Sequence, residues 1–278
     1  MTRLAIPDGG SDASRRPEKA FFTVFEPRAT ETPLVVEVPH AGLAVPAEFV
    51  ADLVAPVRAL GRDADLHVDE LYADAPDFGA TLIVANVSRY VVDLNRAETD
   101  WDRDGARMPR GLVWHITTDG ERCLSRPLQR TDVDARLDLV HRPYHATLKK
   151  LLDEKKSRFG IAILLAAHSM PSTGRGGILR ADVVPGTQGR TTAAGRFIDA
   201  VDAHAQREKW NVRHDEPYKG GYSTRIYGKP IDDIHAVQVE IARRLYMDET
   251  TLIPSNSFDQ VRTWCASLVE KLGQTALR

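Results

Sequence analysis

The sequence predicts an α/β protein in which helices flank a mixed, mostly parallel central sheet. Residues 161–169 form an apolar run, Ile-Ala-Ile-Leu-Leu-Ala-Ala-His-Ser, and residues 34–39 form a second run that only Glu37 interrupts. Runs that are apolar on both faces are typical of parallel strands buried in the middle of a sheet. Segments with helical spacing alternate with the strand-like stretches, as in the α/β class.

Local patterns predict the other elements. Further strands are expected at 21–25, 81–87, 90–94, 113–117, 212–214 and 236–241. Helices are expected at 46–60, 63–75, 131–156, 191–207 and 257–272, and Pro143 should kink or split the longest of them. The charged segment 98–110 contains Gly105 and Pro109 and predicts a surface loop that reaches over a crevice.

The composition indicates a cytoplasmic protein with no nucleic-acid or membrane partner. The 278 residues are 42% hydrophobic, which suits one large domain, expected at 19–278 after a flexible leader at 1–18. A formal net charge of -2 offers no footprint for nucleic acid or anionic lipid. Cys123 and Cys265 are the only cysteines, so a disulfide framework is not expected. No apolar run approaches the roughly 20 residues that span a bilayer.

Each of the two apolar runs leads to a histidine. His40 follows the first run and His168 lies near the end of the second. Ligands of open α/β sheets bind outside the carboxyl ends of the strands, so the two imidazoles should meet there. Either histidine alone is compatible with a hydrogen-bonded residue that closes a strand. The pair indicates a metal site, because neutral imidazole is a preferred ligand of zinc.

The third metal ligand is expected among the carboxylates near His40. We predict Asp65, ahead of Asp63, because the chain returns to the sheet through the helix that these residues open. The alternative is that both aspartates only cap this helix. His67 and Glu70, spaced i and i+3 on one helix face, form a rival pair of zinc ligands.

Glu240, near the end of the strand at 236–241, is the predicted general base. Three protein ligands leave an open metal position for water, and a nearby carboxylate takes up the water's proton and passes it to a leaving amine. The alternative is that Glu240 forms an ion pair with Arg243 or Arg244 at the strand end.

Cationic residues around the same sheet edge suggest an anionic substrate. A guanidinium beside an amide holds a carboxylate through charge-assisted hydrogen bonds, and cations in Gly-containing loops, Arg175 among them, offer a second anionic contact. Any one arginine alone would be read as a surface charge or as the partner of a carboxylate such as Asp93. The predicted substrate-binding residues are Arg89, Asn95, Arg96, Lys219 and Arg225.

Other common chemistries lack their signatures. The sequence contains no Gly-x-Ser-x-Gly elbow, no Walker-type phosphate loop, no Gly-x-Gly-x-x-Gly after a strand and no His-Glu-x-x-His. A serine hydrolase built on Ser169 and His168 is disfavoured, because adjacent residues of a strand point to opposite faces.

Several of these residues lie in motifs that resemble the N-formylglutamate amidohydrolase family. The matching pieces occur in order between about residues 34 and 249, which is most of the chain. They are Val38-Pro39-His40-Ala41-Gly42, the segment 63–72, the segment 88–96, Arg142-Pro143-Tyr144-His145, Ala167-His168-Ser169, Lys219-Gly220-Gly221-Tyr222, Thr224-Arg225, Tyr227-Gly228 and the segment 238–249.

The resemblance implies metal-dependent hydrolysis of the formyl amide of N-formyl-L-glutamate to formate and L-glutamate, as at the end of a histidine-degradation route. It also implies a phosphorylase/hydrolase-like fold similar to that of zinc carboxypeptidases. By that likeness His40 and His168 match the histidine ligands, Glu240 the base, and Asn95 with Arg96 the grip on the substrate carboxylate. Leu43 stands where the peptidase pattern has a glutamate ligand, so Asp65 stays the predicted third ligand.

Two other functions stay open at this point. One is a zinc amidase or carboxypeptidase-like enzyme that acts on another N-acyl or N-formyl amino acid. The other is a non-catalytic binder of acidic metabolites on the same fold.

Overall fold

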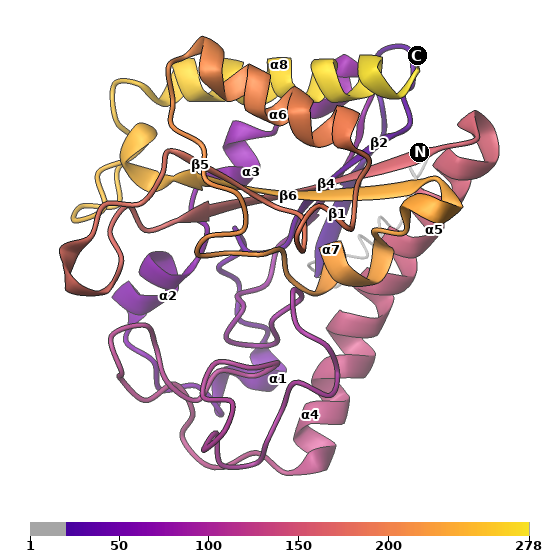
Figure 1. The fold of residues 1–278 in the computed structure, drawn as a ribbon. Coiled ribbons are helices and arrows are strands. Elements are labelled where there is room, and N and C mark those ends of the chain that lie inside the picture. Colours follow the sequence, from indigo (N-terminus) through magenta and orange to yellow (C-terminus); the bar gives the residue numbers. More distant parts are fainter. Residues whose placement is uncertain (1–20, 278) are drawn as a thin grey trace, which may run out of the picture.

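One mixed sheet organises the molecule (Figure 1). The computed structural model describes residues 21–277, so the leader predicted at 1–18 lies outside the described residues. The strands within 21–277 are β1 (Phe22–Phe25), β2 (Leu34–Val38), β3 (Thr81–Ala85), β4 (Ala162–Met170), β5 (Val183–Gly186) and β6 (Ile234–Ala242). Their order is β1-β3-β2-β4-β6-β5, with only the edge strands β1 and β5 antiparallel to their neighbours. The predicted mixed, mostly parallel sheet is confirmed.

Helices cover both faces of this sheet (Figure 1). They are α1 (Ala47–Val50), α2 (Val57–Asp63), α3 (Val68–Leu71), α4 (Arg130–Arg136), α5 (Arg142–Phe159), α6 (Gly195–Arg207), α7 (Tyr222–Tyr227) and α8 (Phe258–Ala276). Helices α3, α6 and α8 contribute to the core on one face, and α4 and α5 to the core on the other. No helix within residues 21–277 is long and apolar enough to cross a bilayer.

The sheet positions explain the unbroken apolar run of β4. Every residue of this strand is buried. Successive side chains of a strand point to opposite faces, so Leu165 enters the core beneath α6 and α8 while Leu164 enters the core beneath α5. A strand with helices on both sides therefore needs apolar residues at both alternating sets of positions.

Replacing Leu165 by Ala is expected to lower the free energy of unfolding by about 2–5 kcal/mol, because the fully buried side chain leaves a cavity. The matched control is Leu139→Ala, whose side chain is 43% exposed and whose loss should change stability by less than about 0.5 kcal/mol. Urea denaturation measures both variants. Equal effects of the two replacements would contradict the central position of β4.

The helices predicted at 46–60 and 63–75 are shorter than expected. The first breaks into α1 and α2, because Pro56 disfavours a helical conformation at the residue before it and starts a new helix. The second shrinks to α3, since Ala64 is extended (φ -73°, ψ 157°) and His67 is left-handed (φ 67°). Asp63 is thus the last residue of α2, and the prediction that Asp63 and Asp65 open a helix is wrong.

Three predicted strands are not strands. Residues 90–94 are buried, but they form turns and irregular chain. In place of the strands expected at 113–117 and 212–214, Trp114, Ile116 and Val212 form isolated β-bridges. Strand β5, which contains Pro185, is not among the predicted strands. A proline is tolerated there because β5 is an edge strand.

The longest predicted helix is irregular before Pro143. Helices α4 and α5 are joined by a π-helical segment, Leu137–His141, so the helical path continues through the proline. Pro143 has no N–H for the carbonyl four residues earlier, and the wider π turn accommodates this missing bond. The segment also turns His141 inward, where its ring reaches the backbone beside the site described next.

Candidate active site

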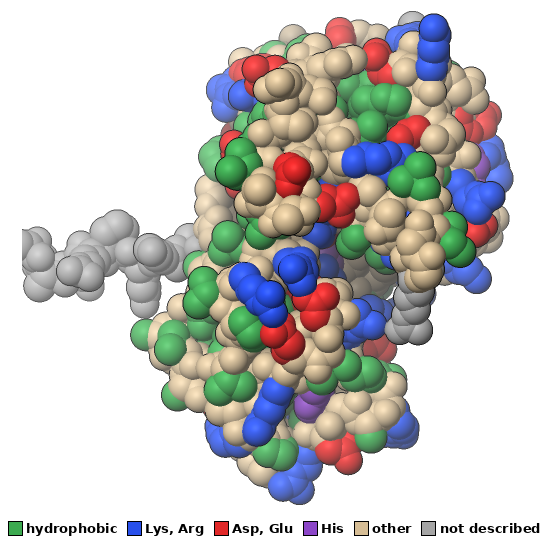
Figure 2. Space-filling view, turned by 90° about the vertical axis from the view of Figure 1, so that its left-hand side faces the viewer, with side chains coloured by type: hydrophobic (Ala, Val, Ile, Leu, Met, Phe, Trp, Pro, Cys, Tyr) green, Lys and Arg blue, Asp and Glu red, His purple; other side chains and the backbone are tan. Residues whose placement is uncertain are grey.

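The carboxyl ends of β2, β4 and β6 open into one cleft of about 1300 Å³. Figure 2 faces this side of the molecule and shows a hollow between an upper and a lower part of the surface, with Lys and Arg side chains around it. Residues 107–110 of the predicted surface loop line the cleft, which confirms that the loop reaches this crevice. The predicted site residues in the lining are His40, Asp65, Arg89, Asn95, Arg96, His168, Lys219, Arg225 and Glu240.

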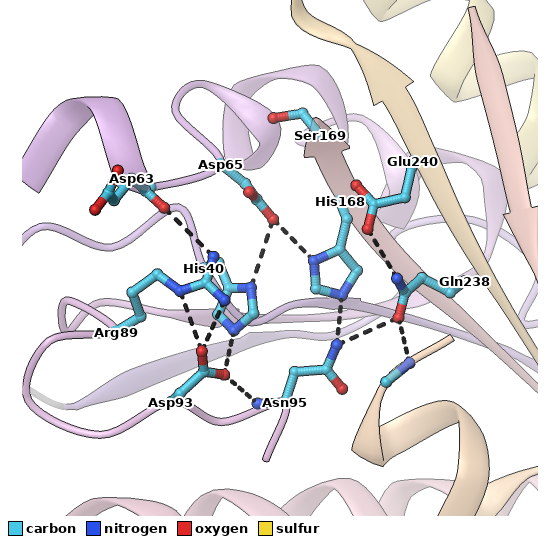
Figure 3. Close-up of polar contacts among 12 residues, drawn as sticks. His40, Asp63, Asp65, Arg89, Asp93, Asn95, His168, Ser169, Gln238 and Glu240 are labelled. Carbon is cyan, nitrogen blue, oxygen red and sulfur yellow. Dashed lines mark hydrogen bonds and ion pairs between the residues drawn. The ribbon is translucent and has the colours of Figure 1, made fainter. Parts of the chain in front are cut away.

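Three predicted metal ligands meet in the floor of the cleft (Figure 3). One potential ligand atom from each of His40, Asp65 and His168 lies within 4.8 Å of the other two. Asp65 Oδ2 is 2.8 Å from His168 Nδ1 and 3.5 Å from His40 Nδ1, and the two rings are 5.0 Å apart at their centroids. The Asp65 backbone N–H also donates to the His40 carbonyl at 3.0 Å, so a hydrogen bond links the chain segments that carry these two residues.

The surroundings of His40 make Nδ1 the ring nitrogen that suits metal binding. His40 Nε2 lies 2.8 Å from Asp93 Oδ1. Burial alone would raise the pKa of Asp93, but the Arg89 guanidinium and His40 hold it well below its usual range, so Asp93 is an acceptor. A neutral His40 must then donate from Nε2 and keep the lone pair on Nδ1, which is the arrangement that a metal-binding histidine needs.

Tertiary contacts hold Asp65 in a connection that is not helical. Arg243 donates to the carbonyl oxygens of Arg62 and Ala64, each at 2.6 Å, and its Nη2 lies 3.5 Å from Asp65 Oδ1. Burial acts to raise the pKa of Asp65, but the neighbouring His168 and His40 rings outweigh it and hold the pKa well below its usual range. Two imidazoles and an ionised carboxylate form a donor set that fits a divalent metal such as zinc.

Glu240 lies on β6 directly beside His168 in the strand register. The carboxylate is buried, which raises its pKa, and Oε1 accepts a hydrogen bond from Gln238 Nε2 at 2.8 Å. Glu240 does not form the alternative ion pair with Arg243 or Arg244. Arg243 donates to backbone carbonyls instead, and Arg244 pairs with Asp182 at 2.6 Å. A buried carboxylate with a raised pKa beside a metal site is suited to proton transfer.

The predicted substrate-binding residues fall into two groups. The Arg89 guanidinium hydrogen-bonds other protein groups, because it donates to Asp93 Oδ2 at 2.7 Å and to the Asp63 carbonyl at 3.3 Å. Arg96, Lys219 and Arg225 are exposed in the cleft, and no ion pair within residues 21–277 occupies them. Their charges are therefore available to an anionic ligand.

Two histidines fix the backbone on either side of Asn95. His145 Nε2 donates to the Leu94 carbonyl and His141 Nε2 to the Arg96 carbonyl, each at 2.9 Å. Burial lowers the pKa of both rings, that of His145 to about 3, so both donate as neutral imidazoles. The π segment and the first turn of α5 thereby present Asn95 and Arg96 to the cleft.

The rival ligands lie apart from the three converging residues. Asp63 accepts hydrogen bonds from Tyr90 and Thr118, which use both of its oxygens. His67 Nδ1 and Glu70 Oε1 do pair at 2.7 Å, but the Glu70 side chain is 57% exposed outside the cleft lining. Neither alternative belongs to the group of His40, Asp65 and His168.

Three polar residues around the site are not among the predicted site residues. Asp93 is predicted only as the partner of an arginine, and neither Gln238 nor Glu37 is predicted at the site. Gln238 precedes Glu240 by two residues on one strand, so the two-residue period could have placed both on one face. Glu37, the one break in its apolar run, is fully buried and accepts from Tyr144 and Ser223.

Comparisons with known proteins agree on one family. The family model of N-formylglutamate amidohydrolase matches residues 32–247. N-formylglutamate deformylase of Pseudomonas putida is 34% identical over 232 residues, and that of Pseudomonas aeruginosa is 36% identical over 226 residues. Each alignment covers 78% of this chain and 83% of the relative.

Solved structures agree with these matches. The crystal structure of N-formylglutamate amidohydrolase from Ralstonia eutropha has a TM-score of 0.85 at 28% identity, covering 92% of this chain and 98% of that chain. A gene product from Agrobacterium tumefaciens, 20% identical, has a TM-score of 0.68 and shares the fold. The length of the family match and the identity to curated relatives establish that this chain belongs to the N-formylglutamate amidohydrolase family.

Proposed function

We propose that this protein is a metal-dependent amidohydrolase that cleaves the formyl amide of N-formyl-L-glutamate into formate and L-glutamate. The observation that carries the proposal is the convergence of His40, Asp65 and His168 beside the buried Glu240. The same cleft is lined by Arg96, Lys219 and Arg225, which form no ion pair within residues 21–277. Relatives that are 34% and 36% identical over most of the chain carry the name N-formylglutamate deformylase, which supports this substrate.

In this proposal His40, Asp65 and His168 would hold the divalent ion, for which zinc fits the donor set. When bound, such an ion polarises a carbonyl oxygen and lowers the pKa of water. Asp93 orients His40 through Nε2, and Arg89 in turn holds Asp93. In this role Asp93 and Arg89 support the proposed ligands.

Glu240 moves the proton in the proposed reaction. Its carboxylate accepts a proton from the attacking water as the water oxygen bonds to the formyl carbon. Glu240 then delivers that proton to the amide nitrogen as the C–N bond breaks, so that formate and an amine leave. A proton taken up in the first step is thus returned in the second, and Glu240 ends in its starting state.

The exposed cations supply the contacts to the two substrate carboxylates. We assign the α-carboxylate to Arg96 with Asn95, and the side-chain carboxylate to Lys219 or Arg225 across the cleft. Arginine binds a carboxylate through two parallel hydrogen bonds, which also fixes the orientation of the substrate.

Replacing Arg96 by Met is expected to raise KM for N-formyl-L-glutamate roughly 10–100-fold, the cost of losing one or two charge-assisted hydrogen bonds. Steady-state formate release measures the effect. The matched control is Arg213→Met, because Arg213 pairs with Glu216 at the surface outside the cleft lining, and its loss should leave KM unchanged. An unchanged KM in the Arg96 variant would remove Arg96 from the carboxylate contact.

A substrate panel tests the proposed function directly. Protein purified without chelator is assayed for amine and acid release from N-formyl-L-glutamate, N-formyl-L-aspartate, N-acetyl-L-glutamate and N-formyl-L-leucine, with elemental analysis of the same preparation. We expect stoichiometric metal and the highest kcat/KM for N-formyl-L-glutamate. Faster turnover of an acetylated or apolar compound would favour an amidase of different specificity. Metal-free protein without turnover would indicate a binder of acidic metabolites.

We also place the reaction in the cytoplasm. Cys123 and Cys265 are both buried free thiols, which suits a reducing compartment. Fractionation of the source cells tests this location, and recovery of the protein with secreted enzymes would contradict it.

A further inference from the structure

We propose that Gln238 is a positioning residue for Glu240, the general base. Gln238 hydrogen-bonds one carboxylate oxygen of Glu240 and thereby leaves the other oxygen for the attacking water. The inference rests on the proposed role of Glu240. Within residues 21–277, Gln238 Nε2 is the one donor that hydrogen-bonds the Glu240 side chain, at 2.8 Å (Figure 3). A carboxylate on a strand end without other donors depends on this contact for its orientation.

The strand geometry places the two side chains together. Gln238 and Glu240 are two residues apart on β6, so both point to the same face of the sheet. Both are buried, with exposed fractions of 3% and 5%. Glu240 lies level with His168 on the neighbouring strand, and Gln238 lies one step deeper beneath the cleft. Gln238 and Glu240 thus lie side by side in the lining of the cleft, with Gln238 further from the strand end.

Backbone donors determine which end of the Gln238 amide faces Glu240. The Gly221 N–H, which can only donate, lies 2.8 Å from Gln238 Oε1. Asn95 Nδ2 donates to the same oxygen at 3.2 Å, and the Ser223 N–H fixes the orientation of Asn95 through Oδ1 at 3.1 Å. The Gln238 oxygen must therefore face Gly221, and its Nε2 must face Glu240. An N–H group in this place favours an unprotonated oxygen on Glu240.

This arrangement explains the two glycines of the Lys219-Gly220-Gly221-Tyr222 motif. A Cβ on Gly221 would overlap the Asn95 amide, so only glycine lets this backbone N–H approach Gln238. Gly220 has a φ of +96°, which favours glycine, and it lies so close to β5 that a Cβ on Gly186 would be 2.5 Å from the Gly220 nitrogen. The motif brings a backbone donor to the amide that holds the base.

Gln238→Glu tests the proposal with little change in shape. The variant keeps an oxygen for Gly221 and Asn95 but places an oxygen where the N–H faced Glu240. The two carboxylates then either repel each other or share a proton, and in both cases Glu240 loses its role as a free acceptor. Displacing a group by about 1 Å costs up to 10²-fold in rate, so we expect kcat to fall about 10–100-fold with KM changed less than about threefold.

A double-mutant cycle separates positioning from general damage. In a Glu240→Ala background, Gln238→Glu should change kcat by less than about threefold, because the residue that it positions is absent. Metal content should stay stoichiometric in all variants. Val237→Ala is the control, since Val237 is buried on the opposite face of β6 and should lower stability while leaving kcat unchanged.

The outcomes distinguish this inference from the proposed function. A Gln238→Glu enzyme with wild-type kcat, or one with the same loss in both backgrounds, would overturn the positioning role alone. Wild-type turnover in Glu240→Ala would instead overturn the base assignment, and the inference about Gln238 with it. A large rise in KM without a loss of kcat would show that Gln238 acts through Asn95 and the substrate contact, which also contradicts the proposal.

Discussion

Replacing Glu240 by Gln is expected to lower kcat for N-formyl-L-glutamate by about 10²–10⁴-fold, the usual contribution of a general base. The amide fills the same space and can still accept the hydrogen bond from Gln238 Nε2, but it cannot take a proton from water. Metal content should stay stoichiometric, because Glu240 is not one of the three converging ligands. Formate release and elemental analysis of one preparation measure both properties.

The control for this experiment is Glu70→Gln. Glu70 pairs with His67 outside the cleft lining, and the same chemical change there should leave kcat within about twofold of wild type. The control also tests the rival site, since a metal held by His67 and Glu70 would be lost in this variant. A Glu240→Gln enzyme that keeps more than about a tenth of wild-type turnover would show that another group takes the proton.

The histidines of the site could be predicted because they depend on sheet topology. Buried parallel strands have a distinctive sequence pattern, and the carboxyl ends of such strands meet at one edge. His40 and His168 follow two such strands, β2 and β4, which are neighbours in the sheet. The alternation of residues 236–241 predicts a strand with Glu240 near its end, and in the structure this strand, β6, lies next to β4. These positions require only that each strand is recognised and that the sheet is parallel.

Asp65 was assigned from a helix that the structure does not contain. The residue lies in an irregular connection, held by hydrogen bonds from Arg243 to the Arg62 and Ala64 carbonyls. Arg243 is about 180 residues away in the sequence, and local propensity contains no information on such a contact. The role of Gln238 was hidden for the same reason, because its partners Gly221 and Asn95 come from other parts of the chain.

The electrostatics of the site also follow from long-range contacts. Arg89 lies four residues before Asp93, so the sequence alone suggests a local ion pair or a free substrate contact equally well. In the structure Asp93 lies between Arg89 and His40, so the Arg89 guanidinium is paired with a carboxylate that also contacts a proposed metal ligand.

Asp65→Ala is expected to remove the stoichiometric metal and to lower turnover by at least about 100-fold. Asp65 is the only anionic member of the converging group, and its loss leaves His40 and His168 without the carboxylate that faces both rings. We expect this effect to exceed the roughly 10–100-fold change in metal affinity that follows when a residue that only hydrogen-bonds a metal ligand is replaced. Elemental analysis after purification without chelator measures the metal directly.

Thermal unfolding with added zinc gives a second readout of Asp65→Ala that does not depend on turnover. A ligand at 100 times its Kd stabilises the native state by about 2.7 kcal/mol, so zinc should raise the Tm of chelator-treated wild-type protein and leave that of the Asp65 variant nearly unchanged. Asp63→Asn is the matched control: its partners are Tyr90 and Thr118, so stability should fall while the zinc-dependent shift persists. The reverse result would be a zinc-dependent shift that disappears in Asp63→Asn and persists in Asp65→Ala. It would make Asp63 the third ligand, and the contacts of Asp65 with the two histidines would then be a structural ion pair.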